Sequence, residues 1–217
     1  MYFVIEGVIG VGKTTLARML QPSFDANLLL EVFEENPFLS DFYSDRARYA
    51  FQTQIFFLLS RYHQQNNGVP ALLQENRHII GDYTFDKDSL FARINLKGDE
   101  LDMYNRVHEA LGEKITQPDL VVYLRASTKM LMQRIALRDR PYERQMERDY
   151  IASLNQAYEE YFVHQADQRQ TPVLAIDSND MDFVRNPEDL SWIENRIRQV
   201  LQLPPFQPEL PLVGNAS

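Results

Sequence analysis

Residues 2–15 read Tyr-Phe-Val-Ile-Glu-Gly-Val-Ile-Gly-Val-Gly-Lys-Thr-Thr, so that an apolar run leads directly into a glycine-rich segment. The run is typical of a buried strand, and residues 7–14 have the G-x-x-x-x-G-K-[ST] spacing of a phosphate-binding loop. Glycines let successive backbone N–H groups point at phosphate oxygens, and the positive end of the following helix dipole adds to the attraction. A strand, this loop and a helix in succession favour a parallel α/β fold.

The loop predicts binding of a nucleoside triphosphate together with Mg²⁺, and by itself it leaves open a kinase, a GTPase switch or an ATPase. Lys13 is expected to neutralise the β- and γ-phosphates, and the Thr14 hydroxyl to ligate Mg²⁺. The alternative is a glycine-rich turn that merely ends a strand, which the combination of strand, spacing, lysine and threonine disfavours. The expected nucleotide-binding residues of the loop are Gly7, Gly10, Gly12, Lys13, Thr14 and Thr15.

Short apolar runs recur along the chain and are separated by helical stretches. The runs are residues 2–6, 27–33, 78–82, 120–124 and 173–177. The expected helices cover residues 46–65, 99–112, 127–138, 147–168 and 187–201, and one more begins at Asn36-Pro37. This alternation predicts an α/β fold with a five-stranded, doubly wound parallel sheet flanked by helices.

The composition limits the class of protein. The 217 residues suffice for one domain, expected over residues 1–202, followed by a proline-rich tail over 203–217. The chain has no cysteine, and its net charge of −9 argues against a nucleic-acid-binding surface. No apolar run approaches the roughly 18 residues of a membrane span, and no targeting segment is evident, so we expect a cytoplasmic protein without a membrane partner.

An arginine cluster narrows the chemistry. Arg134, Arg138 and Arg140 lie late in an expected helix and in the loop that follows it. Guanidinium groups bind phosphate in a bidentate manner, so the cluster predicts a short lid over the triphosphate, with Arg138 and Arg140 stabilising the charge on the transferring group. The alternative is a solvated basic helix end that the dipole favours.

An acidic cluster follows the second apolar run. A carboxylate at the carboxyl end of that strand would lie close to the γ-phosphate and could accept a proton from a hydroxyl group. Of Glu31, Glu34 and Glu35, Glu31 is nearest to the strand and is the expected catalytic base, while some of the three belong to an exposed acidic loop. On the third strand, Asp82 is expected to hold Mg²⁺ through its water shell together with Thr14.

Several motifs, which follow one another along the chain in a specific order and spacing, give it a family resemblance. They are Ile-Glu-Gly-x-Ile-Gly-x-Gly-Lys-Thr-Thr, Glu31 followed by Glu-Glu-Asn-Pro-Phe-Leu-x-x-Phe-Tyr, Gln54 with Leu-Ser-Arg61, residues 82–88, the arginine lid and residues 177–183. In these motifs the chain resembles the deoxynucleoside kinases, and most of all the bacterial deoxyadenosine/deoxyguanosine kinase branch, from residue 2 to about residue 201.

The resemblance implies roles for individual residues. Glu31 would be the general base on the deoxyribose 5′-hydroxyl, Gln54 and Asp88 would bind the base, and Arg61 would hold Asp88. Tyr43 and Glu143 match the pair that binds the 3′-hydroxyl. The loop with Asp182 and Phe183 would hold the adenine of the donor, with Phe183 and Arg134 on either side of the ring. Homodimers through the long helices are also usual in this family.

The chain departs from the family pattern at one position. The family usually has an arginine directly after the acidic residue that ends the third strand, and this chain has Tyr83 there. A tyrosine carries no permanent positive charge. We hypothesise that Lys87, expected in the same loop, binds substrate in place of that arginine.

The predicted function is transfer of the γ-phosphoryl group of ATP to the 5′-hydroxyl of a purine 2′-deoxynucleoside. One alternative is a nucleoside monophosphate kinase of the thymidylate-kinase type, which shares the opening motif. Its acceptor is a phosphate dianion that a carboxylate at Glu31 would repel. A less favoured alternative is a nucleotide-dependent switch, and the chain has no Asn-Lys-x-Asp element of the guanine-selective kind.

Overall fold

The computed structural model describes residues 1–32, 35–75, 77–165 and 170–205. Within them, five parallel strands form one sheet in the order β2-β3-β1-β4-β5. The predicted five-stranded parallel sheet is therefore confirmed. The strands are β1 (Tyr2–Glu6), β2 (Ala26–Leu29), β3 (His78–Gly81), β4 (Leu120–Arg125) and β5 (Val173–Asp177).

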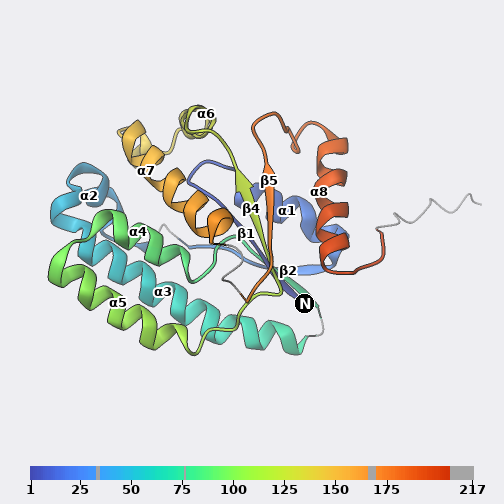
Figure 1. Ribbon diagram of the computed structural model, residues 1–217, viewed down its shortest axis with the longest axis horizontal. Helices are drawn as coiled ribbons and strands as arrows, with labels where there is room; N and C mark the ends of the chain where they lie inside the picture. The colour runs from blue at the N-terminus through green and yellow to red at the C-terminus, as the bar shows by residue number, and fades with distance from the viewer. Residues whose placement is uncertain (33–34, 76, 166–169, 206–217) are drawn as a thin grey trace, which may run out of the picture.

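Helices cover both faces of the sheet, as Figure 1 shows. One face carries α1 (Lys13–Phe24) and α8 (Pro187–Val200). The other face carries α3 (Arg46–Gln74), α4 (Lys87–Asn95) and α7 (Arg148–Glu159), with α5 (Gly98–Gly112) packed outside α3 and α4. The remaining helices are α2 (Leu39–Ser44), α6 (Thr128–Arg138), the 3₁₀ turn η2 (Pro141–Glu143) and the π-helix η3 (Glu160–His164).

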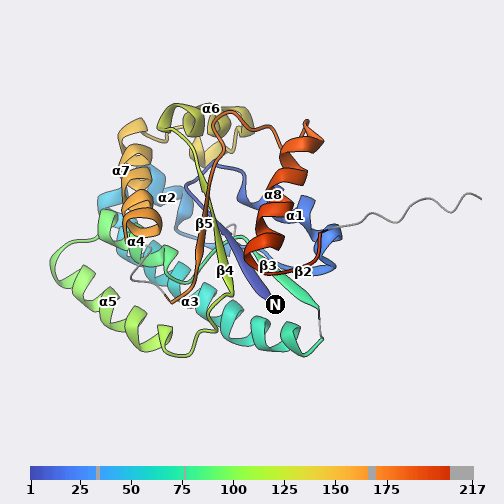
Figure 2. The ribbon, with the colours of Figure 1, turned by 45° about the vertical axis from the view of Figure 1, so that its right-hand side comes forward.

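The strand β1 lies at the centre of the sheet, between β3 and β4. All five of its residues are buried, which explains why the first four form a continuous apolar run rather than an alternating pattern. The chain winds from β1 toward β2 on one side and later toward β4 and β5 on the other. The loop after β1 therefore lies at the topological switch point, where ligands bind in open parallel sheets. In Figure 2, α6 lies across the same end of the sheet.

Several expected boundaries were wrong for reasons that the structure shows. The second strand ends at Leu29 instead of residue 33, because side chains bind the next backbone groups in place of a neighbouring strand. The Gln64 amide donates to the Leu30 carbonyl at 2.7 Å, and an Asp82 oxygen accepts the Glu31 N–H at 2.8 Å. Glu31 consequently lies just beyond β2.

The helical predictions also need correction. α3 continues to Gln74, with Pro70 inside it, because its last turns pack Val69 against β1 and β3. The helix expected at Asn36-Pro37 begins only at Leu39, and Asn36 is used in the preceding turn, where its side chain accepts the Phe38 N–H. The expected helix 147–168 is α7 followed by the π-helix η3.

Helix α4 was not predicted, and Lys87, expected in a loop, is its first residue. The tail over residues 203–217 lies largely outside the described residues, as does Glu34. Among the described residues, none of the helices is both long and apolar enough to cross a membrane.

Candidate functional site

The phosphate loop joins β1 to α1. Gly12, the residue before α1, has φ of 108°, and a Cβ there would lie 3.1 Å from the ring of Phe183. A Cβ on Gly7, with φ of 147°, would lie 2.5 Å from the Leu124 carbonyl oxygen. Both positions favour glycine, because other residues rarely adopt these angles. At Gly7 the Leu124 backbone also leaves no room for a Cβ, and at Gly12 a Cβ would push against the Phe183 ring.

Lys13 folds back over this loop. Its Nζ donates to the Gly7 carbonyl at 2.7 Å and to the Val8 carbonyl at 3.4 Å. Burial and the nearby Lys87 lower the pKa of Lys13 to about 8, against the opposing influence of the surrounding carboxylates. A phosphate group would supply the anion that this partly buried cation needs.

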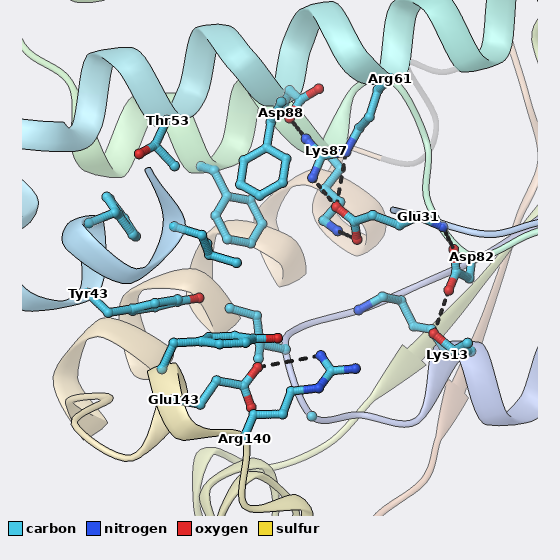
Figure 3. A pocket seen from close by; sticks show the side chains of 18 of the residues that line it. Lys13, Glu31, Tyr43, Thr53, Arg61, Asp82, Lys87, Asp88, Arg140 and Glu143 are labelled. Carbon is cyan, nitrogen blue, oxygen red and sulfur yellow. Dashed lines mark hydrogen bonds and ion pairs between the residues drawn. The ribbon is translucent and has the colours of Figure 1, made fainter. Parts of the chain in front are cut away.

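Glu31 lies at the same cavity as the phosphate loop, and two cations bind its carboxylate (Figure 3). Lys87 Nζ lies 2.6 Å from one oxygen of Glu31, and Arg61 donates to the other, with Nε at 3.1 Å. Burial by itself would raise the pKa of this carboxyl, but Arg61 and Lys87 lower it well below its usual range. The carboxylate is therefore ionised and able to accept a hydrogen bond from a hydroxyl group.

Asp82 connects Glu31 to the phosphate loop. One of its oxygens accepts the Glu31 N–H at 2.8 Å, and the other accepts the Thr14 hydroxyl at 2.5 Å. Oxygen ligands from one or two side chains, completed by phosphate oxygens and water, suit Mg²⁺. Thr14 and Asp82 therefore fit the expected metal, although no group of three His, Cys, Asp or Glu side chains suited to a metal occurs among the described residues.

The far end of the cavity combines polar groups with aromatic walls. Arg61 forms an ion pair with Asp88 as well as with Glu31, so that the Arg61 guanidinium lies between the two carboxylates. Gln54 is buried and lines the same cavity from α3. Tyr43 stacks on Tyr142, with ring centroids 6.0 Å apart. Figure 3 shows Tyr43 opposite the α3 side of the cavity.

Glu143 holds the lid arginines in the described structure. Arg138 Nη2 lies 2.6 Å from each oxygen of Glu143, and Arg140 Nη1 lies 3.7 Å from one of them. Glu143 is buried, whereas the side chains of both arginines are about one-third exposed. Arg138, Arg140 and Glu143 all line the cavity.

The expected arginine cluster divides into two parts. Arg134 does not line the cavity with Arg138 and Arg140. Its guanidinium donates to the Val11 carbonyl at 3.1 Å and to the Ser178 carbonyl at 2.7 Å, so it joins α6 to the phosphate loop and to the loop after β5. The sequence spacing had placed Arg134 in one cluster with Arg138 and Arg140. These bonds instead direct the Arg134 side chain away from the other two.

The remaining predicted residues lie around the loop after β5. Phe183 is buried with its ring against Gly12, and Asp182 is exposed, with its side chain accepting the Arg185 N–H at 3.1 Å. Thr15 is exposed in the first turn of α1. The cavity itself collects most of the predicted residues: Gly10, Lys13, Thr14, Glu31, Tyr43, Gln54, Arg61, Asp82, Lys87, Asp88, Arg138, Arg140 and Glu143.

The sequence analysis missed two residues that shape this site. Gln64 binds the backbone beside Glu31, and it accepts the Tyr83 hydroxyl at 2.5 Å. Its position three residues after Arg61, on the same side of one helix, was the available signal. Tyr142 stacks on Tyr43, and only its place beside Glu143 pointed to it. Tyr83 itself is fully buried, and Lys87 supplies positive charge beside Glu31.

A phosphate loop at the switch point, facing a second pocket with its own carboxylate and aromatic walls, defines a P-loop phosphotransferase. The deoxynucleoside kinase family model matches residues 3–202, and the chain belongs to this family. It is an ATP-dependent deoxynucleoside kinase by that membership.

The chain is also similar to named deoxynucleoside kinases and to a solved structure of one. The chain is 34% identical to deoxyguanosine kinase of Bacillus subtilis (strain 168) over 202 residues, covering 92% of this chain and 97% of the relative. It is 34% identical to deoxyadenosine kinase of Dictyostelium discoideum, covering 88% of this chain and 76% of the relative. The structure of M. mycoides deoxyadenosine kinase with products dCMP and a flexible dCDP bound matches with a TM-score of 0.78 and 26% identity, covering 92% of this chain and 100% of that one.

Proposed function

We propose that this protein transfers the γ-phosphoryl group of ATP to the 5′-hydroxyl of a purine 2′-deoxynucleoside, deoxyadenosine or deoxyguanosine, for nucleotide salvage. The observation that carries the proposal is the position of Glu31, which lines one cavity with Lys13 and Thr14 of the phosphate loop. An ionised carboxylate suits a neutral hydroxyl acceptor and repels a phosphate acceptor. The names of the two relatives that are 34% identical support a purine nucleoside.

In this reaction, Glu31 accepts a hydrogen bond from the 5′-hydroxyl and receives its proton as the new P–O bond forms. Lys13 and the lid arginines, Arg138 and Arg140, neutralise the charge on the transferring group and on the ADP that leaves. Catalysis of this kind rests mainly on positioning and charge neutralisation. Mg²⁺, held by Thr14 and Asp82, would neutralise phosphate oxygens. We assign the remaining residues to the donor nucleotide: the glycines of the phosphate loop, Thr15, Arg134, Asp182 and Phe183.

The residues assigned to the deoxynucleoside fall into two groups, one for its nucleobase and one for its sugar. Gln54 presents both a donor and an acceptor, and Asp88, held by Arg61, accepts from an amino or imino group of the base. Tyr43 and Glu143 bind the 3′-hydroxyl. Lys87 takes the place of the arginine that Tyr83 replaces, because it brings a cation to within 2.6 Å of Glu31.

A substrate panel tests the proposal. The four common deoxynucleosides are each incubated with ATP and Mg²⁺, and ADP release is measured by a coupled assay. We expect ADP release only with an acceptor present, and kcat/KM for deoxyadenosine or deoxyguanosine at least about tenfold above thymidine, or roughly 1.4 kcal/mol. Equal turnover of thymidine would reject the purine preference. Slow hydrolysis regardless of acceptor would favour a switch, and turnover of a monophosphate alone would favour the thymidylate-kinase alternative.

The remaining parts of the proposal concern the whole chain. Residues 1–202 form the kinase domain and residues 203–217 a tail, and the protein works in the cytoplasm as a homodimer. Exposed apolar side chains on two neighbouring helices, Leu59 of α3 and Met103 of α5, support a dimer through the long helices. Sedimentation equilibrium of the wild type and of a Leu59→Glu/Met103→Glu double variant tests it, with a monomeric double variant expected.

A further inference from the structure

A buried carboxylate outside the residues assigned above joins the two halves of the site. Glu6 is the last residue of β1 and is fully buried. Its Oε2 accepts the Gly7 N–H at 3.0 Å, at the start of the phosphate loop. Its Oε1 accepts both the Thr84 N–H at 2.6 Å and the Thr84 hydroxyl at 3.1 Å. One side chain therefore binds the phosphate loop and the segment that follows β3.

Thr84 passes this connection to α4. Its Oγ1 accepts the N–H of Lys87, the first residue of the helix, at 3.3 Å. Asp86, the residue before the helix, makes no capping bond with its side chain, so Thr84 caps the first turn in its place. The same turn carries Lys87, which contacts Glu31, and Asp88, which contacts Arg61.

We propose that Glu6 is a positioning residue that, through Thr84, fixes the first turn of α4 relative to the phosphate loop. The inference rests on the proposed function, and it adds a determinant of how the acceptor hydroxyl is placed against the γ-phosphate. Phosphoryl transfer requires the reacting atoms within about 3–3.5 Å of each other, so a small displacement of one half of the site slows the reaction. Glu6 needs no contact with either substrate for this role.

The charge state of the side chain is part of the argument. Three donors converge on the two oxygens of Glu6, and an ionised carboxylate can accept all three bonds. Burial raises the pKa of this carboxyl, while the nearby Lys87 and Lys13 and the bound N–H groups of Thr84 and Gly7 act in the opposite direction. An amide at this position would turn its NH₂ group toward either Gly7 or Thr84 and would lose the bond on that side. A buried carboxylate also costs free energy unless its oxygens are bonded, which these donors provide.

Two variants of Thr84 test the link between Glu6 and the first turn of α4. Thr84→Ser keeps the hydroxyl, and we expect its kinetic constants to stay within about twofold of the wild type. Thr84→Val keeps the branched shape but lacks the hydroxyl. We expect it to reduce kcat/KM for the deoxynucleoside about tenfold, or roughly 1.4 kcal/mol, with KM for ATP unchanged because Glu6 still binds Gly7.

Glu6→Gln tests the contacts of Glu6 with both Gly7 and Thr84. Glu159→Gln is the matched control. The carboxylate of Glu159 accepts from Tyr123 and Arg125 and does not line the cavity. We expect Glu6→Gln to lower kcat at least about tenfold and to raise KM for at least one substrate. Glu159→Gln should change the melting temperature only.

The outcomes are separable. If Thr84→Val and Thr84→Ser have the same kinetic constants, or if folded Glu6→Gln has wild-type kinetics with only a lower melting temperature, the proposal is wrong. If Glu6→Gln does not fold, the Thr84 pair decides. A wild-type protein that phosphorylates no deoxynucleoside would instead reject the proposed function, since that measurement involves no variant.

Discussion

Two cationic side chains make Glu31, the candidate general base, a weak proton acceptor. Glu31 is bound by both Lys87 and Arg61, and its pKa lies well below the usual range of a carboxyl group despite its burial. Phosphoryl transfer passes through a loose transition state, in which the acceptor oxygen forms little bond before the leaving group departs. A strong base is unnecessary for such a reaction. In the proposed reaction, Glu31 would accept the hydrogen bond of the 5′-hydroxyl and receive its proton late.

The first prediction concerns the carboxylate itself. Glu31→Gln keeps the shape of the side chain but removes its ability to accept the proton, and we expect kcat to fall about a hundredfold or more. Affinity for ADP should change little, because the phosphate loop and the residues assigned to adenine are intact. Steady-state kinetics with deoxyadenosine or deoxyguanosine and an ADP titration measure the two effects. A kcat above a tenth of the wild-type value would contradict the role of Glu31 as base.

The second prediction concerns the cation beside the base. Lys87→Ala removes one of the two positive charges on Glu31, and we expect kcat/KM for the deoxynucleoside to fall about tenfold or more. Lys87→Arg keeps the charge and is the matched variant, which should retain more activity than Lys87→Ala. Turnover of Lys87→Ala near that of the wild type would show that Lys87 does not replace the arginine absent at position 83.

At the scale of secondary structure, the sequence predicted the elements that its local pattern encodes. The strand β1 and the loop after it were placed correctly, because a buried parallel strand needs a continuous apolar run and the loop needs its glycines. Helix α4 was missed because the sequence gives it no apolar stripe at its start. Its first residues, Lys87 and Asp88, are charged yet buried, since Glu31 and Arg61 bind them from elsewhere in the chain.

The third prediction separates two glycines with positive φ. Gly12→Ala places a Cβ 3.1 Å from the Phe183 ring, at φ of 108°, and we expect loss of measurable ATP binding because the loop must deform. Gly98, at φ of 54° with nothing within 4 Å of an added Cβ, is the control. Gly98→Ala should cost about 1 kcal/mol of unfolding free energy and keep full activity. Calorimetric ATP titration and urea unfolding distinguish them, and equal ATP affinities would contradict the prediction.

At the scale of the whole molecule, the site depends on contacts between segments that are far apart in the sequence. Arg61 and Glu31 are thirty positions apart, and Thr14 and Asp82 are sixty-eight apart. The resemblance to the family predicted that Arg61 holds Asp88, and the structure places them together. It did not predict that the same guanidinium also binds Glu31, because no local pattern determines how α3 crosses the end of β2. The division of the arginine cluster was missed for the same reason.

The last prediction concerns the end of the chain. Arg198 of α8 is buried over the ring of Phe24, pairs with Glu194 at 2.9 Å and donates to the Pro204 carbonyl at 3.0 Å. These contacts hold α8 and the residues after it against α1. A chain that ends at residue 205 retains all of them, and we expect its melting temperature and kcat to match those of the full chain.

Arg198→Ala is the matched variant, made in the full chain. It leaves Glu194 without its partner, so we expect a loss of roughly 3 kcal/mol of unfolding free energy, with KM for both substrates unchanged because Arg198 does not line the cavity. Thermal and urea unfolding with steady-state kinetics measure both proteins. If the chain ending at residue 205 lost activity while Arg198→Ala kept its stability, the boundary of the kinase domain would lie beyond residue 202.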